Sequence, residues 1–411
     1  DAEEIDVIEQ QLASSVYVDE GTLQLSGATA NLLGTATGAI YLRGTLDLNG
    51  AGVAAAPYAS ATALPTVSIG ALVGGGSTSP VVQAQTTASA AVTNSTTLTV
   101  ASAAGIALGQ TVIGLNAVNG TPNSGTAVVT GISGTTITLS APLTLAAGNN
   151  LNFVAAVTTG ATVTNTGSTA AAIALTGSSA ANFTGLIQDG GAPLTVIKNA
   201  AGIQVMTGMN TYTGATVITS GTLSVWNLAN IGMPSALGKG DASSPAANAA
   251  SLVLNGGTLQ YGGTGTAGAL QLTQTPSVAI DRLFTLAASS AIASDGFFGN
   301  NYLTTLSANH AALVFANTGA IAFGPAAAAA RSLTLQGGSI GDNEIALQLI
   351  DNGSSATPLS LTKTGAGLWF LSNAANSYTG QTSILQGTLR VTNNQASLPA
   401  GSPLLLSGSA G

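Results

Sequence analysis

The chain has 411 residues, of which 45% are hydrophobic and 5% are charged, and it contains no cysteine. An ordinary soluble domain carries roughly 25% charged residues. The composition therefore argues against a compact globule and favours stacked strands whose surface is solvated by hydroxyl and amide side chains. The lack of cysteine excludes disulfide bonds, thiolate metal sites and thiol nucleophiles. The net charge of −8 leaves no basic surface for nucleic acid or anionic lipid.

The first fifteen residues have the pattern of a short amphipathic helix. Ile5, Ile8 and Leu12 recur at helical spacing among acidic residues. We expect residues 1–15 to cap the first coil of a solenoid or to dock a neighbouring subunit. The chain starts at Asp1 without a basic leader, as in a mature secreted protein or a trimmed chain. No run of about twenty apolar residues predicts a membrane span.

Residues 16–79 and 80–157 differ in their patterns. The first range contains Gly-Thr-Leu-x-apolar pieces that start at Gly21 and Gly44, and it is interpreted as the first part of a β-solenoid. The second range lacks these pieces. It has five short alternating segments separated by turn pairs such as Asn119-Gly120 and Ser133-Gly134, which indicate hairpins. The segments lie near residues 95–102, 110–118, 125–132, 135–143 and 150–157. The sequence predicts that residues 80–157 form a small inserted antiparallel β-barrel or sandwich.

Residues 158–411 carry the clearest internal repeat, with copies at 187–227 and 350–393. Each copy has a strand ending in lysine, then a glycine, then Asn-x-Tyr-Thr-Gly, and finally Gly-Thr-Leu-x-Val. We interpret this range as the main β-solenoid. The structural repeat positions are Lys198, Gly202, Asn210, Tyr212, Gly214, Gly221 and Leu223 in the first copy, and Lys363, Gly367, Asn376, Tyr378, Gly380, Gly387 and Leu389 in the second.

The spacing within a copy predicts a strand and a corner in turn. Each five-residue piece alternates its side chains across a strand, and the glycine before it permits a sharp turn. Equivalent side chains of successive coils then stack about 4.8 Å apart, which favours columns of threonine and asparagine over columns of like charge. This stacking accounts for the low charge. It predicts a continuous strand column between the regions around residues 210 and 376.

The pattern Lys-x-Gly-x-Gly, followed by Asn-x-Tyr-Thr-Gly and Gly-Thr-Leu, resembles the autotransporter passenger-associated strand repeat. Lys363-Thr-Gly-Ala-Gly367 fits it fully, whereas Ala200 replaces the first glycine in the other copy, which affects only the local turn. The resemblance covers about residues 16–75 and 158–411. It implies a right-handed parallel β-helix that is secreted to or beyond the bacterial cell surface, in proteins that serve as stalks, adhesins or sheaths.

Groups for catalysis are few. His310 is the only histidine, so a catalytic triad has one possible base, and a zinc site is excluded. A calcium site at Asp342 and Glu344 is conceivable, but the spacing of the acids is irregular. Asp189, Asp295 and Asp351 stand before glycines in patterns typical of turns. We expect no enzyme, no catalytic residue, no metal site and no cofactor. The charged residues available for a catalytic cleft are Asp281, Arg282, Asp295, Asp342, Glu344 and Asp351.

The aromatic residues of the repeat copies are interpreted as core or stacking residues rather than a platform for sugar binding. They are Tyr212, Trp226, Trp369, Phe370 and Tyr378.

The sequence thus predicts an extracellular or cell-surface structural protein, either a stalk or a fibre subunit that stacks end to end with copies of itself. The alternative is an adhesin that binds glycan or a host protein through the inserted module or an aromatic cluster. A polysaccharide lyase or hydrolase is the third hypothesis, and it requires carboxylates that converge in one cleft. No nucleic acid partner and no membrane insertion of this segment are expected.

Overall fold

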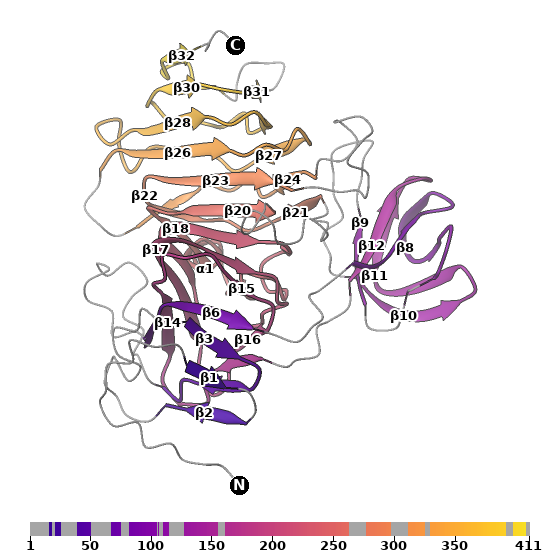
Figure 1. The fold of residues 1–411 in the computed structure, drawn as a ribbon. Coiled ribbons are helices and arrows are strands. Elements are labelled where there is room, and N and C mark those ends of the chain that lie inside the picture. The colour runs from indigo at the N-terminus through magenta and orange to yellow at the C-terminus, as the bar shows by residue number, and fades with distance from the viewer. Residues whose placement is uncertain are drawn as a thin grey trace.

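The computed structural model describes residues 16–18, 21–25, 39–50, 67–74, 82–104, 106, 110–114, 127–154, 161–262, 277–296, 311–324, 329–391 and 398–407. In these residues, parallel strands stack as successive coils of a β-helix, and a separate antiparallel sheet lies beside it (Figure 1). The predicted all-β parallel β-helix is confirmed, while its handedness stays a prediction. The helix predicted at residues 1–15 lies outside the described residues.

The first part of the solenoid is built from short strands on both sides of the inserted segment. Leu46 of β4 aligns in parallel with Val163 of β13, and Ile69 of β5 aligns with Leu175 of β14. The coils therefore continue directly from one side of the insertion to the other. The strands are β1 (Val16–Val18), β2 (Thr22–Gln24), β3 (Ala39–Leu42), β4 (Thr45–Asp47), β5 (Val67–Ile69), β6 (Ala71–Gly74), β13 (Thr162–Thr164), β14 (Ala171–Leu175), β15 (Ala181–Phe183) and β16 (Leu186–Ile187).

The longer part of the solenoid follows without a break in the stacking, and it holds the one helix of the described residues. It consists of β17 (Leu194–Met206), β18 (Thr216–Val225), α1 (Pro245–Ser251), β19 (Leu252–Asn255), β20 (Thr258–Gly262), β21 (Val278–Ile280), β22 (Thr285–Ala288), β23 (Ser290–Asp295), β24 (Leu313–Phe315), β25 (Ala322–Phe323), β26 (Arg331–Gln336), β27 (Asn343–Ile345), β28 (Leu359–Lys363), β29 (Leu368–Leu371), β30 (Thr382–Ile384), β31 (Thr388–Val391) and β32 (Leu404–Leu406).

The solenoid core consists of columns of like apolar side chains. Leu223, Leu259, Ile292 and Leu335 align from β18 through β20 and β23 to β26, and each is fully buried. Since side chains alternate along a strand, their neighbours face outward and are mostly Thr, Ser, Gln or Ala. Full burial of such a side chain stabilises the fold by about 1.5–3 kcal/mol. The column reaches Lys363 in the next coil, so one sheet joins the two repeat copies.

Helix α1 occupies a corner between β18 and β19. It begins after Ser244, whose hydroxyl accepts a hydrogen bond from the N–H of Ala247, and a proline stands in its first turn. Asn248 binds the helix to the next coil, because its Oδ1 accepts from the N–H of Leu283 and its Nδ2 donates to the carbonyl of Asp281. Within the described part of the chain, no helix has the length and hydrophobicity needed to cross a membrane.

The inserted segment forms a six-stranded antiparallel sheet with its own apolar core. Its edge strands β7 and β8 meet at an antiparallel bridge between Ala88 and Val100, which closes the sheet into a small barrel. Figure 1 places this barrel beside the stack of coils rather than in line with it. Its strands are β7 (Val82–Thr87), β8 (Val92–Thr99), β9 (Thr111–Gly114), β10 (Ala127–Ser133), β11 (Thr136–Leu145) and β12 (Asn150–Val154).

Candidate functional site

The two repeat lysines point into the core of the solenoid. Lys198 follows Leu175 in one inward column, and Lys363 follows Leu335 in another. Both side chains are almost completely shielded from solvent. Among the described residues neither ammonium has a carboxylate within ion-pair distance. Their charge must therefore be balanced by neutral dipoles.

Backbone carbonyls supply these dipoles. The Nζ of Lys363 donates to the carbonyl oxygens of Thr364 at 2.7 Å, Gly365 at 2.6 Å and Gln386 at 3.1 Å. An ammonium has three N–H donors, so the three acceptors match its capacity. Two of them belong to the corner that follows β28 and one to the corner of the next coil. The lysine thus satisfies buried carbonyls and connects two coils.

Burial lowers the pKa of Lys198 and of Lys363 from 10.5 to about 8, because the ammonium loses its hydration. The folded protein then releases these protons before the unfolded chain does. The free energy of unfolding should therefore rise with pH between about 8 and 10.5. Replacing both lysines by methionine keeps the stem and removes the charge, so this rise should shrink. Urea midpoints across that pH window test this, and equal slopes for the two proteins would contradict it.

The repeat asparagine connects three coils. Asn210 is fully buried; its Oδ1 accepts from the N–H of Ile187 at 2.8 Å, and its Nδ2 donates to the carbonyl of Ala236 at 3.0 Å. In the second copy, the Oδ1 of Asn376 accepts from the N–H of Leu349 at 2.8 Å. A side-chain amide suits this position because it offers a donor and an acceptor at once.

The repeat tyrosine fills the coil interior next to a buried threonine. The hydroxyl groups of Tyr212 and Thr216 lie 2.7 Å apart, and those of Tyr378 and Thr382 lie 2.8 Å apart. Burial raises the pKa of both phenols. Each tyrosine therefore stays neutral and fills the core while its hydroxyl keeps a partner.

The repeat glycines mark close approaches between coils. At each of the six positions, a Cβ would lie less than 3.0 Å from a backbone oxygen of the preceding coil. Gly221 and Gly387 also have positive φ angles of 65° and 74°. Leu223 is buried in the core column, and Leu389 is half-buried against the hydrophobic core of the solenoid, where it aligns with Trp369. The other four close glycines are Gly202, Gly214, Gly367 and Gly380.

Asp189 and Asp351, which the sequence predicts as turn residues, also form hydrogen bonds between coils. The Oδ1 of Asp189 accepts from the N–H of Leu194 at 2.8 Å, which is the local bond expected in a turn. Its Oδ2 also accepts from the N–H and the hydroxyl of Thr213 in the following coil, at 3.0 and 2.6 Å. Asp351 makes the same pair of contacts with Thr379. The sequence signal was an acid near the start of each copy and a threonine in each Tyr-Thr-Gly.

An aspartate that accepts from both the N–H and the hydroxyl of a threonine in the next coil is called a clasp here, and a clasp also occurs outside the repeats. Asp47 accepts from the N–H and the hydroxyl of Thr166, at 3.0 and 2.6 Å, although the inserted barrel separates the two residues in the chain. Burial alone would raise the pKa of Asp47, but hydrogen bonds, chiefly that from the Thr166 hydroxyl, bring it below the ordinary value. A carboxylate clasp therefore joins the coils on either side of the insertion.

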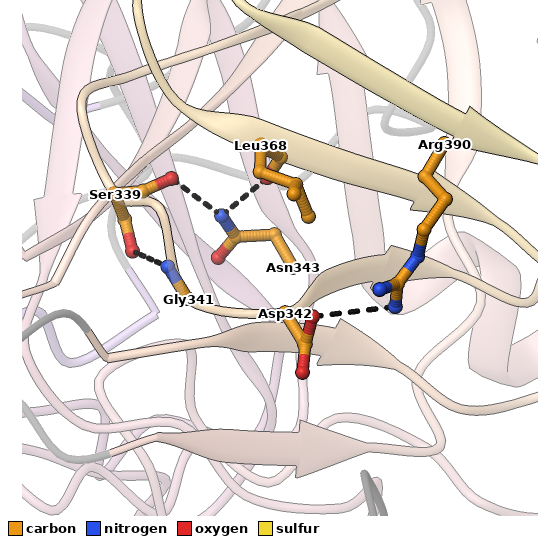
Figure 2. A network of polar contacts seen from close by, with 6 residues as sticks. All are labelled: Ser339, Gly341, Asp342, Asn343, Leu368 and Arg390. Carbon is orange, nitrogen blue, oxygen red and sulfur yellow. Dashed lines mark hydrogen bonds and ion pairs between the residues drawn. The ribbon is translucent and has the colours of Figure 1, made fainter. Parts of the chain in front are cut away.

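The groups weighed for catalysis do not meet in one cleft. Asp342 forms an exposed ion pair with Arg390 at 3.2 Å, and the Nδ2 of Asn343 donates to the carbonyls of Ser339 and Leu368 (Figure 2). Within the described ranges, no three acidic or histidine side chains are grouped to hold a metal ion. His310 lies outside those ranges.

Arg282 and the aromatic residues also have structural surroundings. Arg282 is fully buried and donates to the carbonyls of Ala229 at 2.8 Å and Gly238 at 2.6 Å, so it is no surface base. Trp369 is buried and donates to the carbonyl of Gln336 at 2.9 Å. The guanidinium of Arg390 lies 4.6 Å from the ring centre of the half-buried Phe370. Trp226 is half-buried.

Comparison with known proteins identifies the repeat. A family model described as passenger-associated-transport-repeat matches residues 196–225 and 361–391. The adhesin BmaC autotransporter of Brucella suis biovar 1 (strain 1330) is 36% identical over 195 residues, which is 47% of this chain and 5% of that protein. The resemblance to an autotransporter passenger repeat protein is thus confirmed. The chain spans one twentieth of this relative's length.

Two solved structures resemble the chain over most of its length. One is the Gp54 tailspike of Acinetobacter baumannii bacteriophage AP22 in complex with A. baumannii capsular saccharide, with 13% identity and a TM-score of 0.22 over 92% of this chain and 64% of the tailspike. The other is the tailspike protein gp49 from Pseudomonas phage LKA1, with 12% identity and a TM-score of 0.21 over 95% and 67%. These scores are too low to support any argument, so the fold assignment rests on the strand pairing.

Proposed function

We propose that this chain is a segment of a secreted autotransporter passenger and serves at the bacterial surface as a stiff stalk. The observation that carries the proposal is the set of polar contacts between coils. The polar side chains of the repeats form hydrogen bonds with the backbone or side chains of their own and neighbouring coils. These side chains are the repeat lysines, asparagines, tyrosines and aspartates. Bending such a stack would separate several buried hydrogen-bond partners at once, each at a cost of about 1–3 kcal/mol.

The stalk proposal predicts a fixed distance between the ends of the stack. The strands β1, β3, β6, β15, β17, β18, β20, β23, β26, β28, β30 and β32 pair in that order. At about 4.8 Å per step, the ends should lie about 50–55 Å apart. Since the chain has no cysteine, spin labels at Tyr17→Cys and Leu405→Cys would report this distance by pulsed electron resonance.

We expect a narrow distance distribution for this pair. Moving the first label from Tyr17 to Tyr41, one coil closer, should shorten the distance by about 5 Å with the same width. A distribution broader than about two coil spacings would show a flexible linker and defeat the stalk proposal. Light scattering on the same samples would report the end-to-end self-association expected of a fibre subunit.

An adhesin is the second candidate, because the similar Brucella protein is named an adhesin and because the barrel has its own core beside the stack. Replacing residues 80–157 by a short Gly-Ser linker separates the two functions. If the chain is a stalk only, this variant keeps the distance between the labels, and cells that display it adhere as before. If adherence is lost while the distance is unchanged, the barrel is the part that binds glycan or host protein.

A further inference from the structure

A polar hollow crosses several coils on the flank of the solenoid. Its volume is about 330 Å³, at the lower end of the range of about 300–1,000 Å³ typical of small-molecule sites. Its walls are formed by β18, β20, β23 and β26 and by the corners after β28 and before β31. The lining residues that could contact a ligand include Thr258, Gln260, Ala293, Asp295, Gln336 and Gln386.

The hollow arises from one short side chain in an outward column. Ala293 of β23 aligns between Gln260 of β20 and Gln336 of β26. The neighbour of Ala293 in the strand, Ile292, faces the core, so the three column residues face outward. Two glutamines thus form walls on either side of an alanine floor, with amide groups that can both donate and accept.

Asp295 adds one carboxylate at the end of β23, on the same face as Ala293. Its Oδ2 accepts from the Nε2 of Gln260 at 2.9 Å, and its Oδ1 accepts from the N–H of Gly338 at 2.7 Å. Among the described residues, Asp295 has no lysine or arginine within ion-pair distance. The Lys363 ammonium lies nearby, but it is buried, does not line the hollow, and binds the carbonyls of Thr364, Gly365 and Gln386 with its three donors. Asp295 is therefore the charged group that faces the hollow; it disfavours an anionic ligand and leaves acceptor capacity for hydroxyl donors.

We propose that this hollow binds a neutral, hydroxyl-rich saccharide unit. Sugar hydroxyls donate to the Asp295 carboxylate and to amide oxygens, and they accept from the amide N–H groups of Gln336 and Gln386. The volume suits one or two sugar rings. Among the residues that the structure describes, no aromatic side chain lines the hollow, so these residues bind a sugar through hydrogen bonds alone and weakly. The proposal goes beyond the stalk function and does not depend on it.

Saturation-transfer NMR with maltotriose, cellotriose and mannotriose tests the proposal on the full chain, with trigalacturonate as the anionic probe. At least one neutral trisaccharide should receive saturation, and trigalacturonate should not. Ala293→Gln continues the glutamine column and fills the hollow, so it should weaken binding at least about tenfold. Ala291→Thr is the matched control: Ala291 aligns between Thr258 and Thr334 and does not line the hollow. It should bind as the parent does.

A second variant covers the case in which Ala293→Gln perturbs the strand. Gln336→Ala removes one wall without adding bulk, and it should weaken binding about three- to tenfold with an unchanged circular dichroism spectrum. The proposal is overturned if no neutral trisaccharide receives saturation, if trigalacturonate alone does, or if the folded Ala293→Gln and Gln336→Ala variants both bind like the parent.

Discussion

Replacing Gly221 by alanine should lower the free energy of unfolding by more than about 4 kcal/mol, a loss at the upper end for single substitutions. Gly221 has a φ angle of 65°, where an L-residue is strained by about 1–2 kcal/mol. The added Cβ would also come within 3.0 Å of the carbonyl oxygens of Ala200 and Gly202 in the preceding coil. These oxygens cannot retreat without lengthening the strand pairing between β17 and β18.

Gly353→Ala is the matched control for this effect. Gly353 has a φ angle of 86°, but a Cβ there would meet nothing within 4 Å. It carries the backbone strain without the clash, so its loss should stay near 1–2 kcal/mol. Urea unfolding followed by circular dichroism measures both variants. Equal losses at the two positions would mean that the close approach of the coils contributes nothing to the requirement for glycine.

The sequence could predict the solenoid because its signals are local. The Gly-Thr-Leu pieces lie in β2, β4, β18, β20 and β31. Four of them begin a strand after a turn or bend, whereas Gly221 lies inside the continuous strand β18. The barrel's alternating segments were also recognisable, although β7 (Val82–Thr87) was not among the expected strands. The boundaries of the four predicted domains stay predictions.

The stacking partners were harder to predict, since they depend on how many residues each coil contains. In the first copy, both motif strands lie in one sheet: Val196 aligns with Thr216 and Ile203 with Thr222. In the second copy, β28 stacks in the column that holds the second motif strand of the first copy, while β29 lies in another sheet. The two copies therefore occupy different faces of the solenoid. Corner lengths between the copies decide this, and residue patterns alone do not encode them.

The contacts between coils were least visible in the sequence, because partners such as Asn210 and Ile187 or Asp189 and Thr213 lie more than twenty residues apart. Asp189 was interpreted as a turn residue, and its bond to Leu194 agrees with this, yet the Thr213 clasp becomes visible only when the coils are stacked. Lys198 and Lys363 were predicted as structural repeat positions, but their contacts could not be predicted, since a lysine in an apolar column is rare unless it is paired. Their role follows from carbonyls that the corners bring together.

The isosteric change Asn210→Asp should be strongly destabilising at neutral pH and much less so in acid. A carboxylate at this buried position can still accept from the N–H of Ile187, but it faces the carbonyl of Ala236 with no proton to donate. An unpaired buried acceptor and a desolvated charge together should cost about 3–5 kcal/mol. Protonation restores a donor at the same atom and removes the charge.

The sign of the pH dependence follows from this. The folded-state pKa of the new carboxyl lies above its unfolded value of about 3.9, so the stability of the variant is highest below that value and falls as pH rises through the folded-state pKa. The control Asn373→Asp alters a half-buried amide that also bonds two coils, through Thr318 and Ala346. Water can reach that position, so its loss should be smaller and its pH dependence weaker. If urea midpoints at pH 4 and pH 7 change equally in both variants, the buried asparagine does not hold the coils together in the way that its contacts indicate.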